Sequence, residues 1–225
     1  PIEAISELLA DKPTISFHVD AVQALAKIPT EKYLTDRVDF ATFSSHKFHG
    51  VRGVGFVYIK SGKKITPLLT GGGQERDYRS TTENVAGIAA TAKALRLSME
   101  KLDIFTNKAG QMKSVIRQAL LDYPDIFVFS DEEDFAPHIL TFGIKGVRGE
   151  VIVHAFEDYD IFISTTSACS SKAGKPAGTL IAMGVDKDKA QSAVRLSLDL
   201  ENDMSQVEQF LTKLKLIYNQ TRKVR

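Results

Sequence analysis

The chain has 225 residues, 43% of them hydrophobic, which is enough for one large domain or two smaller ones with a sizeable core. Its 29 lysines and arginines are balanced by 28 acidic residues, so a net charge of +1 disfavours nucleic acid or an anionic membrane as a partner. No stretch approaches the roughly 20 apolar residues of a membrane span, and the N-terminus lacks a signal-peptide pattern. These features predict a cytoplasmic protein that acts on a small molecule.

Two features of the sequence are unusual, a single cysteine and an N-terminus without methionine. Cys169 is the only cysteine, which excludes an internal disulfide and a multi-cysteine zinc site. The chain begins with Pro1, directly before a helix-like apolar pattern, and has no initiator methionine. We therefore expect a processed or truncated chain.

The first part of the chain is expected to form a largely buried α/β sheet. Runs rich in β-branched and aromatic residues predict strands at 14–20, 38–44 and 53–60. Residues 21–29 are expected to be helical until Pro29 stops the helix. A triple glycine then precedes an apolar-periodic helix from Val85 onward, for which Ser80 and Glu83 have the spacing of a capping box.

The second part of the chain is expected to begin with a helix and to continue with several strands. An amphipathic helix over about 106–122 is followed by predicted strands at 126–130, 138–144, 160–164 and 194–200, with a helix at 150–159 before the third. Ser205 and Glu208 are expected to cap a last amphipathic helix. We place a domain boundary near residue 93, which gives domains 1–92 and 93–225.

Lys47 lies in the segment "SSHKFHG", directly after the second predicted strand. Open α/β sheets bind ligands beyond the carboxyl ends of their strands, and Ser44, Ser45 and His46 add donors there. One interpretation is an ordinary lysine in a solvated turn. The other is a partly desolvated Schiff-base lysine of lowered pKa.

Asp20 ends the first predicted strand and makes the second interpretation more specific. A pyridoxal 5'-phosphate enzyme needs a lysine for the aldehyde and a carboxylate for the ring nitrogen, and Lys47 and Asp20 fill these roles. Ser44, His46 and the helix start at "STTEN" offer phosphate donors. The alternative for Asp20 is a helix N-cap.

Two further residues are candidates for substrate chemistry. Cys169 lies in "STTSACSSKAGKPAG", a small and polar segment that indicates an exposed, mobile thiol, although an inert loop cysteine is the alternative. Arg195 alternates with Val194 and Leu196 and is expected to point away from them, as a surface arginine or as a clamp for a substrate carboxylate. The histidines lack the spacing of metal ligands, so we predict no metal site.

The combined motifs resemble the class V aminotransferase superfamily, and closely its NifS/IscS-type cysteine desulfurases. The resemblance covers essentially the whole chain, because "FHVDAVQALAKIP", "SSHKFHGVRGVGFVYI", "GGGQERDYRSTTENVAGIAA" and "STTSACSS" occur in the family's order with similar separations. It implies the α/β fold of PLP-dependent transferases (aspartate aminotransferase-like), with a partial large domain and a small α+β domain.

The resemblance also implies a role for each matching residue. Around pyridoxal 5'-phosphate, it assigns the aldehyde to Lys47, the ring nitrogen to Asp20, the ring hydroxyl to Gln23, and the phosphate to Ser44, His46 and Thr82. Thr82 would come from the other subunit of a homodimer. Arg195 would hold the carboxylate of L-cysteine, and the Cys169 thiolate would take its sulfur as a persulfide and release L-alanine. An acceptor protein, such as an iron–sulfur scaffold or a tRNA-thiolation enzyme, would then receive the sulfur.

The chain departs from the family pattern at two positions and at its start. Val51 stands where the family has proline, and Asp199 replaces a glycine and puts a charge near Arg195. The family's N-terminal part, with a histidine that stacks on the cofactor ring, further phosphate donors and an asparagine near the ring hydroxyl, is expected to be missing. The alternatives are another class V enzyme, such as a selenocysteine lyase or aminotransferase, and an inactive truncated chain that serves as a binding or dimerisation module.

Overall fold

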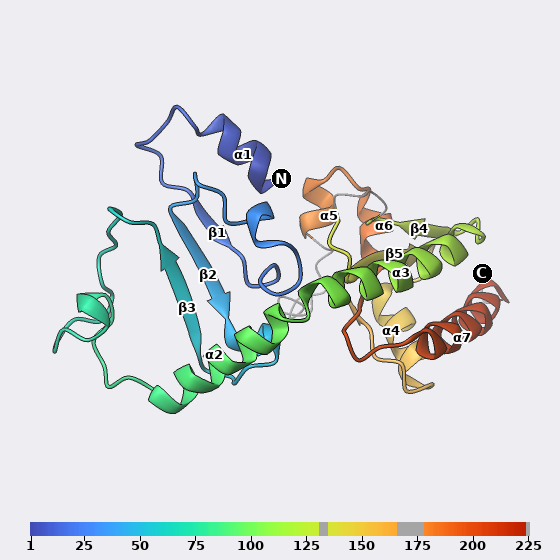
Figure 1. The fold of residues 1–225 in the computed structure, drawn as a ribbon. Coiled ribbons are helices and arrows are strands. Elements are labelled where there is room, and N and C mark those ends of the chain that lie inside the picture. The colour runs from blue at the N-terminus through green and yellow to red at the C-terminus, as the bar shows by residue number, and fades with distance from the viewer. Residues whose placement is uncertain (131–134, 166–177, 224–225) are drawn as a thin grey trace. The chain divides into compact units, whose positions relative to one another are not determined.

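The computed structural model describes residues 1–130, 135–165 and 178–223, so Cys169 lies outside the described residues. The chain divides into two compact units, Pro1–Asp103 and Ile104–Arg225 (Figure 1). The expected boundary near residue 93 lies inside helix α2 (Val85–Met99). This helix belongs to the first unit, because apolar side chains near its end pack against that unit's core.

The first unit is built on a three-stranded sheet in the order β1-β2-β3 (Figure 1). Strand β1 (His18–Asp20) runs parallel to β2 (Phe40–Ser44), and β3 (Gly55–Ile59) returns antiparallel to β2. All three strands lie inside the runs that predicted them. Burial alternates along β2, so that one set of its side chains packs into the core of the unit.

The other regular elements of the first unit are short, apart from α2. They are α1 (Ile2–Leu8), the 3-10 turns η1 (Thr30–Lys32), η2 (Ser45–Phe48) and η3 (Glu75–Asp77), and α2 (Val85–Met99). In the glycine-rich segment before α2, Gly73 adopts a left-handed conformation with φ 81°, which glycine allows and other residues rarely adopt.

The segment after β1 forms turns, and the expected helix over 21–29 is wrong. The amides of Leu25 and Ile28 do bond to carbonyls one helical turn back, at 3.2 and 3.0 Å. Between them, Ala26 adopts a left-handed conformation with φ 59°, which a continuing right-handed helix does not allow. Ala26 is buried in the core of the unit, so tertiary packing has overridden local helical propensity.

A buried carboxylate ties the N-terminal segment to the sheet. Asp39, only 2% exposed, accepts hydrogen bonds from the Phe17 amide at 2.9 Å and from Arg37 at 3.0 Å, and pairs with Lys63 at 3.0 Å. Burial alone would raise the pKa of Asp39. The Phe17 amide and the two cations outweigh that effect and lower the pKa below its ordinary value.

We expect Asp39→Asn to reduce the free energy of unfolding by about 3 kcal/mol near neutral pH, because it leaves the partly buried cations of Arg37 and Lys63 without their buried counter-ion. Since folding lowers the pKa of Asp39, its stabilising effect is fully present above the ordinary aspartate value and is lost as pH falls through the lower folded value. Urea unfolding between pH 7 and pH 3 should therefore show the difference between wild type and variant shrinking with acidification.

The matched control for this prediction is Asp11→Asn, which removes an exposed ion pair to Lys12 at 2.8 Å. It should cost less than about 0.5 kcal/mol. An Asp39→Asn variant as stable as the Asp11→Asn control would contradict the structural role of the buried carboxylate.

The cap of α2 differs from the expected one. The Asn84 side chain accepts a hydrogen bond from the Gly87 amide at 3.0 Å, so the cap is Asn84 and the predicted capping box of Ser80 and Glu83 is wrong. The Ser80 amide instead donates to the Leu69 carbonyl at 3.1 Å. The loop before the helix therefore shifts the helix start beyond the position that spacing alone suggested.

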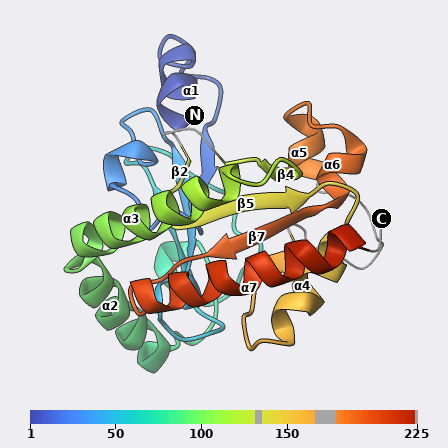
Figure 2. The same ribbon diagram turned by 90° about the vertical axis from the view of Figure 1, so that its right-hand side faces the viewer.

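The second unit contains a four-stranded antiparallel sheet in the order β4-β5-β7-β6 (Figure 2). Its strands are β4 (Ile126–Val128), β5 (Ile139–Ile144), β6 (Ser164–Thr165) and β7 (Ala193–Ser197). Its helices are α3 (Leu102–Leu121), α4 (Gly149–Glu157), α5 (Gly178–Ala182), α6 (Lys187–Gln191) and α7 (Met204–Lys223). The predicted strand at 160–164 is largely wrong, because pairing begins only at Ser164 and Asp160 turns with φ 57°.

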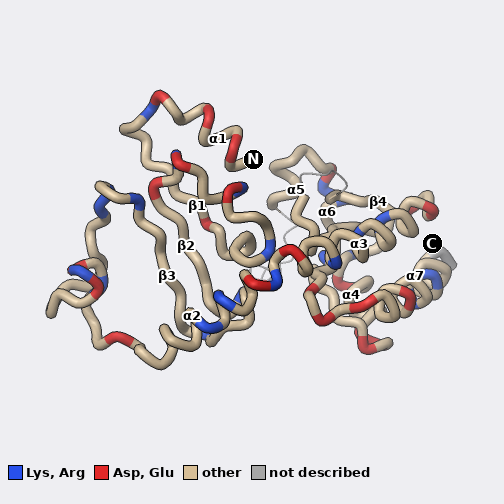
Figure 3. Tube along the Cα trace, viewed as in Figure 1, with Lys and Arg blue, Asp and Glu red and all other residues tan. Residues whose placement is uncertain are grey.

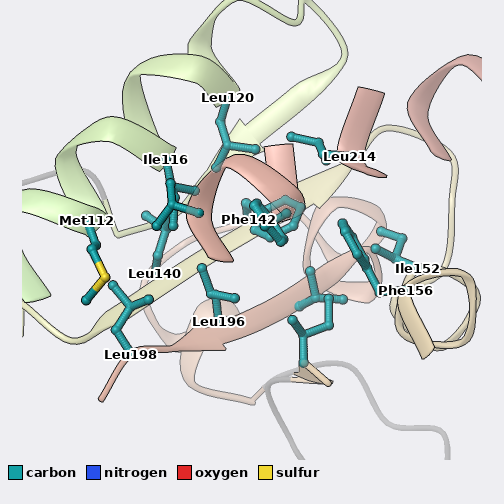
Figure 4. Close-up of a cluster of buried hydrophobic side chains, with 14 of the residues drawn as sticks. Met112, Ile116, Leu120, Leu140, Phe142, Ile152, Phe156, Leu196, Leu198 and Leu214 are labelled. Carbon is teal, nitrogen blue, oxygen red and sulfur yellow. The ribbon is translucent and has the colours of Figure 1, made fainter. Parts of the chain in front are cut away.

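The core of the second unit lies between this sheet and the helices α3, α4 and α7 (Figure 4). Buried side chains from β5 and β7 alternate toward the helices, and Phe156 of α4 stacks on Phe210 of α7 with centroids 5.0 Å apart. The buried members drawn in Figure 4 include Met112, Ile116, Leu120, Leu140, Phe142, Ile152, Leu196 and Leu214. This arrangement fits the small α+β domain that the sequence suggested.

Helix α7 is capped by Asp203, so the predicted cap of Ser205 and Glu208 is wrong. The Asp203 carboxylate accepts hydrogen bonds from the Ser205 hydroxyl at 2.6 Å and the Gln206 amide at 3.0 Å, and these bonds lower its pKa. The Gln206 side chain accepts in return from the Asp203 amide at 3.2 Å. Together these bonds make a reciprocal capping box that starts two residues before the expected one.

Charged residues of both signs are interspersed along both units (Figure 3). Within the described ranges, no helix is long and apolar enough to cross a membrane.

Candidate functional site

The ends of two neighbouring strands bring the predicted cofactor residues to one edge of the first unit's sheet. Because β1 and β2 are parallel, with Asp20 opposite Thr42, their carboxyl ends lie at the same edge. Asp20 is the last residue of β1 and Ser44 the last residue of β2. The turn η2, with His46 and Lys47, follows β2 directly. The structure thus places these four residues where the sequence expected them.

Lys47 lies half-buried in the middle of η2, between the buried residues Ser45 and Phe48. Its amine has no hydrogen bond or ion pair to any described residue. His46 beside it is exposed, and His49 closes the turn in a left-handed conformation with φ 64°. The lysine is therefore held on a short, tightly folded turn while its amine remains uncommitted.

Asp20 does not cap a helix, because turns and not a helix follow it. One carboxylate oxygen accepts a hydrogen bond from the Val22 amide at 3.1 Å, which fixes the side chain at the end of the strand. The other oxygen bonds to no described residue. Gln23 lies exposed in the same turns, so a carboxylate and an amide follow β1 with polar atoms free to bind a ligand.

Ser45 does not play the expected part of a ligand donor. Its side chain is 0% exposed, and its hydroxyl is bonded to the Thr91 hydroxyl of α2 at 2.9 Å. Of the two serines, only Ser44 remains free to reach a ligand. Sequence reasoning missed Thr91, because nothing in a single sequence links residues that lie 46 positions apart.

Thr82 lies exposed in the segment that precedes α2. Its hydroxyl makes no hydrogen bond to another described residue, including those at the strand ends. Within one chain, Thr82 is therefore not joined to the residues around Lys47.

Arg195 occupies β7 in the second unit, opposite Thr141 of β5 and Ser164 of β6. Val194 and Leu196 on either side of it belong to the core, so the arginine points to the other face of the sheet, as predicted. Its Nε atom is buried and has no hydrogen-bond partner among the described residues. An unpaired buried donor is costly, so this position favours an anionic acceptor supplied by a ligand.

Asp199, the charge that sequence reasoning placed near Arg195, is engaged by the backbone. Its carboxylate accepts a hydrogen bond from the Leu200 amide at 2.6 Å, and its own amide donates to Asn202 at 2.7 Å. It therefore stabilises the turn after β7. Cys169 and its segment fall outside the described residues.

The other features that could form a site do not include these residues or are absent from the described parts of the chain. A pocket of about 280 Å³ lies in the second unit between the end of β7 and the start of α7, and none of the predicted site residues lines it. In the described ranges, no group of three or more histidine, cysteine, aspartate or glutamate side chains could hold a metal ion.

The residues at the strand ends fit pyridoxal 5'-phosphate chemically. An amine at Lys47, a carboxylate oxygen at Asp20 and a hydroxyl at Ser44 are all uncommitted within the described structure, and all lie at or directly after the ends of neighbouring strands. These are the groups that an aldehyde, a pyridinium nitrogen and a phosphate require.

Comparison with known proteins gives the chain a family. Residues 1–210 match the family described as Aminotransferase class-V. The chain is 49% identical over its whole length to a NifS/IcsS protein homolog of Lactobacillus delbrueckii subsp. bulgaricus, and 36% identical to cysteine desulfurase IscS of Clostridium botulinum. It covers 58% and 57% of these two proteins, so it spans less than two thirds of their length.

A solved structure of a NifS-like protein has the same fold over nearly all of the chain. The TM-score is 0.85 at 35% sequence identity, and the match covers 97% of this chain and 57% of that one. The chain therefore belongs to the class-V aminotransferase family, within its NifS/IscS cysteine desulfurase group.

Proposed function

We propose that the protein is a pyridoxal 5'-phosphate-dependent cysteine desulfurase that converts L-cysteine to L-alanine and transfers the sulfur to Cys169. The observation that carries the proposal is the position of Asp20, at the carboxyl end of β1, and Lys47, just after the carboxyl end of its parallel neighbour β2. The names of the relatives, one of which is a cysteine desulfurase, support the same activity.

The first unit would hold the cofactor. Lys47 would bind its aldehyde, Asp20 its ring nitrogen and Gln23 its ring hydroxyl, while Ser44 and His46 would bind its phosphate. When bound, the cofactor supplies an electron sink, which Asp20 strengthens by keeping the ring nitrogen protonated.

The second unit would act on the substrate. The guanidinium of Arg195, with its buried and unpaired Nε, would bind the carboxylate of L-cysteine and orient the amino acid. The Cys169 thiolate would attack the substrate sulfur, so that an S–S bond forms while the Cβ–S bond of the substrate breaks. L-Cysteine and the Cys169 thiol would thus give L-alanine and a Cys169 persulfide, with no external oxidant or reductant.

We further propose that the working protein is a homodimer in which Thr82 completes the phosphate site of the partner subunit. Two exposed apolar side chains in the same segment as Thr82, residues 68–85, support an interface, since Leu68 is 95% exposed and Val85 is 71% exposed. The persulfide sulfur would pass to an acceptor protein, such as an iron–sulfur scaffold or a tRNA-thiolation enzyme.

The test is an assay of the protein expressed from its natural gene and supplied with pyridoxal 5'-phosphate and L-cysteine. We expect alanine and persulfide on the Cys169 peptide in equal amounts in a single turnover, and a dimer by light scattering. A protein that binds the cofactor but gives no alanine would refute the proposed activity. A fully active monomer would refute the role of Thr82.

A further inference from the structure

The turn that carries Lys47 is fastened to helix α2 at two points. At its start, the Thr91 hydroxyl is hydrogen-bonded to the Ser45 hydroxyl at 2.9 Å and donates to the Gly87 carbonyl at 2.7 Å. At its end, the Ser98 hydroxyl donates to the Phe48 carbonyl at 3.2 Å. In Figure 1 the end of β2 reaches α2, where these contacts are made.

The two anchors lie on the same face of α2. Positions 91 and 98 are separated by two helical turns, so both side chains face the same neighbour. Lys47 lies between the two anchored residues, Ser45 and Phe48, in the turn. Any rotation of the turn that moves Lys47 must therefore break a contact with the helix.

The anchor at Ser45 is buried and closely packed. Thr91 is 6% exposed and Ser45 is 0% exposed, so water cannot replace their hydrogen bond at low cost. A Cβ atom at Gly50 would lie 1.9 Å from Ser45 Oγ, which shows that the returning chain packs directly against the serine and leaves no room for a side chain there. The Ser45 amide also donates to the Val54 carbonyl at 3.0 Å, which fixes the backbone of the turn.

We propose that Thr91 is a positioning residue for Lys47, which acts through Ser45 to fix the direction of the lysine amine. This inference rests on the proposed function, in which Lys47 binds the aldehyde of the cofactor. Reaction of an amine with an aldehyde requires a defined approach, and a small displacement of the amine lowers the rate strongly. Thr91 would thus set the rate of attachment, although it touches neither the cofactor nor the substrate.

The experiment measures the attachment of pyridoxal 5'-phosphate to Lys47 in the whole protein. The covalent adduct is trapped with borohydride at successive times and pH values, and the Lys47 peptide is quantified by mass spectrometry. We expect Thr91→Val to lower the attachment rate about tenfold, which corresponds to the loss of one buried hydrogen bond. Thr91→Ser, which keeps the hydroxyl, should restore the rate.

The matched control is Thr212→Val on α7. Thr212 makes the same kind of bond to a carbonyl one turn back, at 2.8 Å from Glu208, but contacts no turn that carries a candidate residue. It should leave the attachment rate unchanged. Urea unfolding of each variant gives its folded fraction, by which the rates are corrected.

Ser45→Ala removes the same hydrogen bond from the other side and provides a second variant if Thr91→Val does not fold. We expect Ser45→Ala to match Thr91→Val, and the double variant to be no slower than either single one, because the two residues act through one bond. Wild-type rates in Thr91→Val and Ser45→Ala, after correction for folded protein, would overturn this inference and leave the proposed function intact. A wild-type protein without any adduct on Lys47 would overturn the proposed function and the inference with it.

Discussion

Lys47→Ala should abolish the covalent attachment of pyridoxal 5'-phosphate, so that borohydride treatment leaves no cofactor adduct and the yellow absorbance of the loaded protein disappears. The reason is that Lys47 is the lysine on the turn directly after β2, where it is held half-buried on η2 with an uncommitted amine. Cysteine turnover should fall below detection in the same variant. Peptide mass spectrometry after borohydride reduction identifies the attached lysine in the wild type.

The matched control for Lys47→Ala is Lys64→Ala, which removes an exposed lysine from the loop after β3 in the same unit. It should leave attachment and turnover at wild-type levels. An adduct that persists in Lys47→Ala would show that another lysine anchors the cofactor and would refute the assignment of this turn.

Cys169→Ser should eliminate both alanine and persulfide formation while cofactor attachment at Lys47 and binding of L-cysteine remain. The expected loss is large, because a hydroxyl at this position cannot take the substrate sulfur as a persulfide. Since Cys169 is the only cysteine in the sequence, a sulfur-mass adduct on the wild-type chain can be assigned to it by peptide mapping. Absorbance, alanine release and the mass of the Cys169 peptide measure the three properties separately.

Ser170→Ala is the control for the cysteine variant, because it alters the neighbouring residue and keeps the thiol. It should retain alanine formation and persulfide. Undiminished turnover of cysteine to alanine in Cys169→Ser would instead assign the protein to a lyase or aminotransferase that needs no thiol acceptor.

The positions of the candidate cofactor residues could be predicted because their signals are local. Asp20 ends one run of β-branched and aromatic residues and Lys47 comes shortly after another, and such runs identify strands by their composition. Neighbouring strands that are parallel then bring their carboxyl ends together, as the pairing of β1 with β2 does. The alternation around Arg195 predicted its orientation in the same way, since side chains along a strand point alternately to opposite faces.

Helix boundaries were predicted less accurately than strand ends. They depend on which of several nearby polar side chains forms the capping hydrogen bond with the backbone. Spacing favoured Ser80 as the cap of α2, but the loop turns back to Leu69 and leaves Asn84 at the helix start. The helix expected over 21–29 failed because burial of Ala26 in the core holds it in a left-handed conformation.

The sequence by itself determined the strand ends, the lysine and the carboxylate that follow them, and the family to which these motifs belong. Only the tertiary structure showed that Ser45 faces Thr91 and not a ligand, that the buried Asp39 binds two partly buried cations, and that the Arg195 Nε has no partner among the described residues. Strand composition and alternation are properties of consecutive residues. Hydrogen bonds between distant residues depend on how the elements pack, and a single sequence does not contain the distances that decide which of them form.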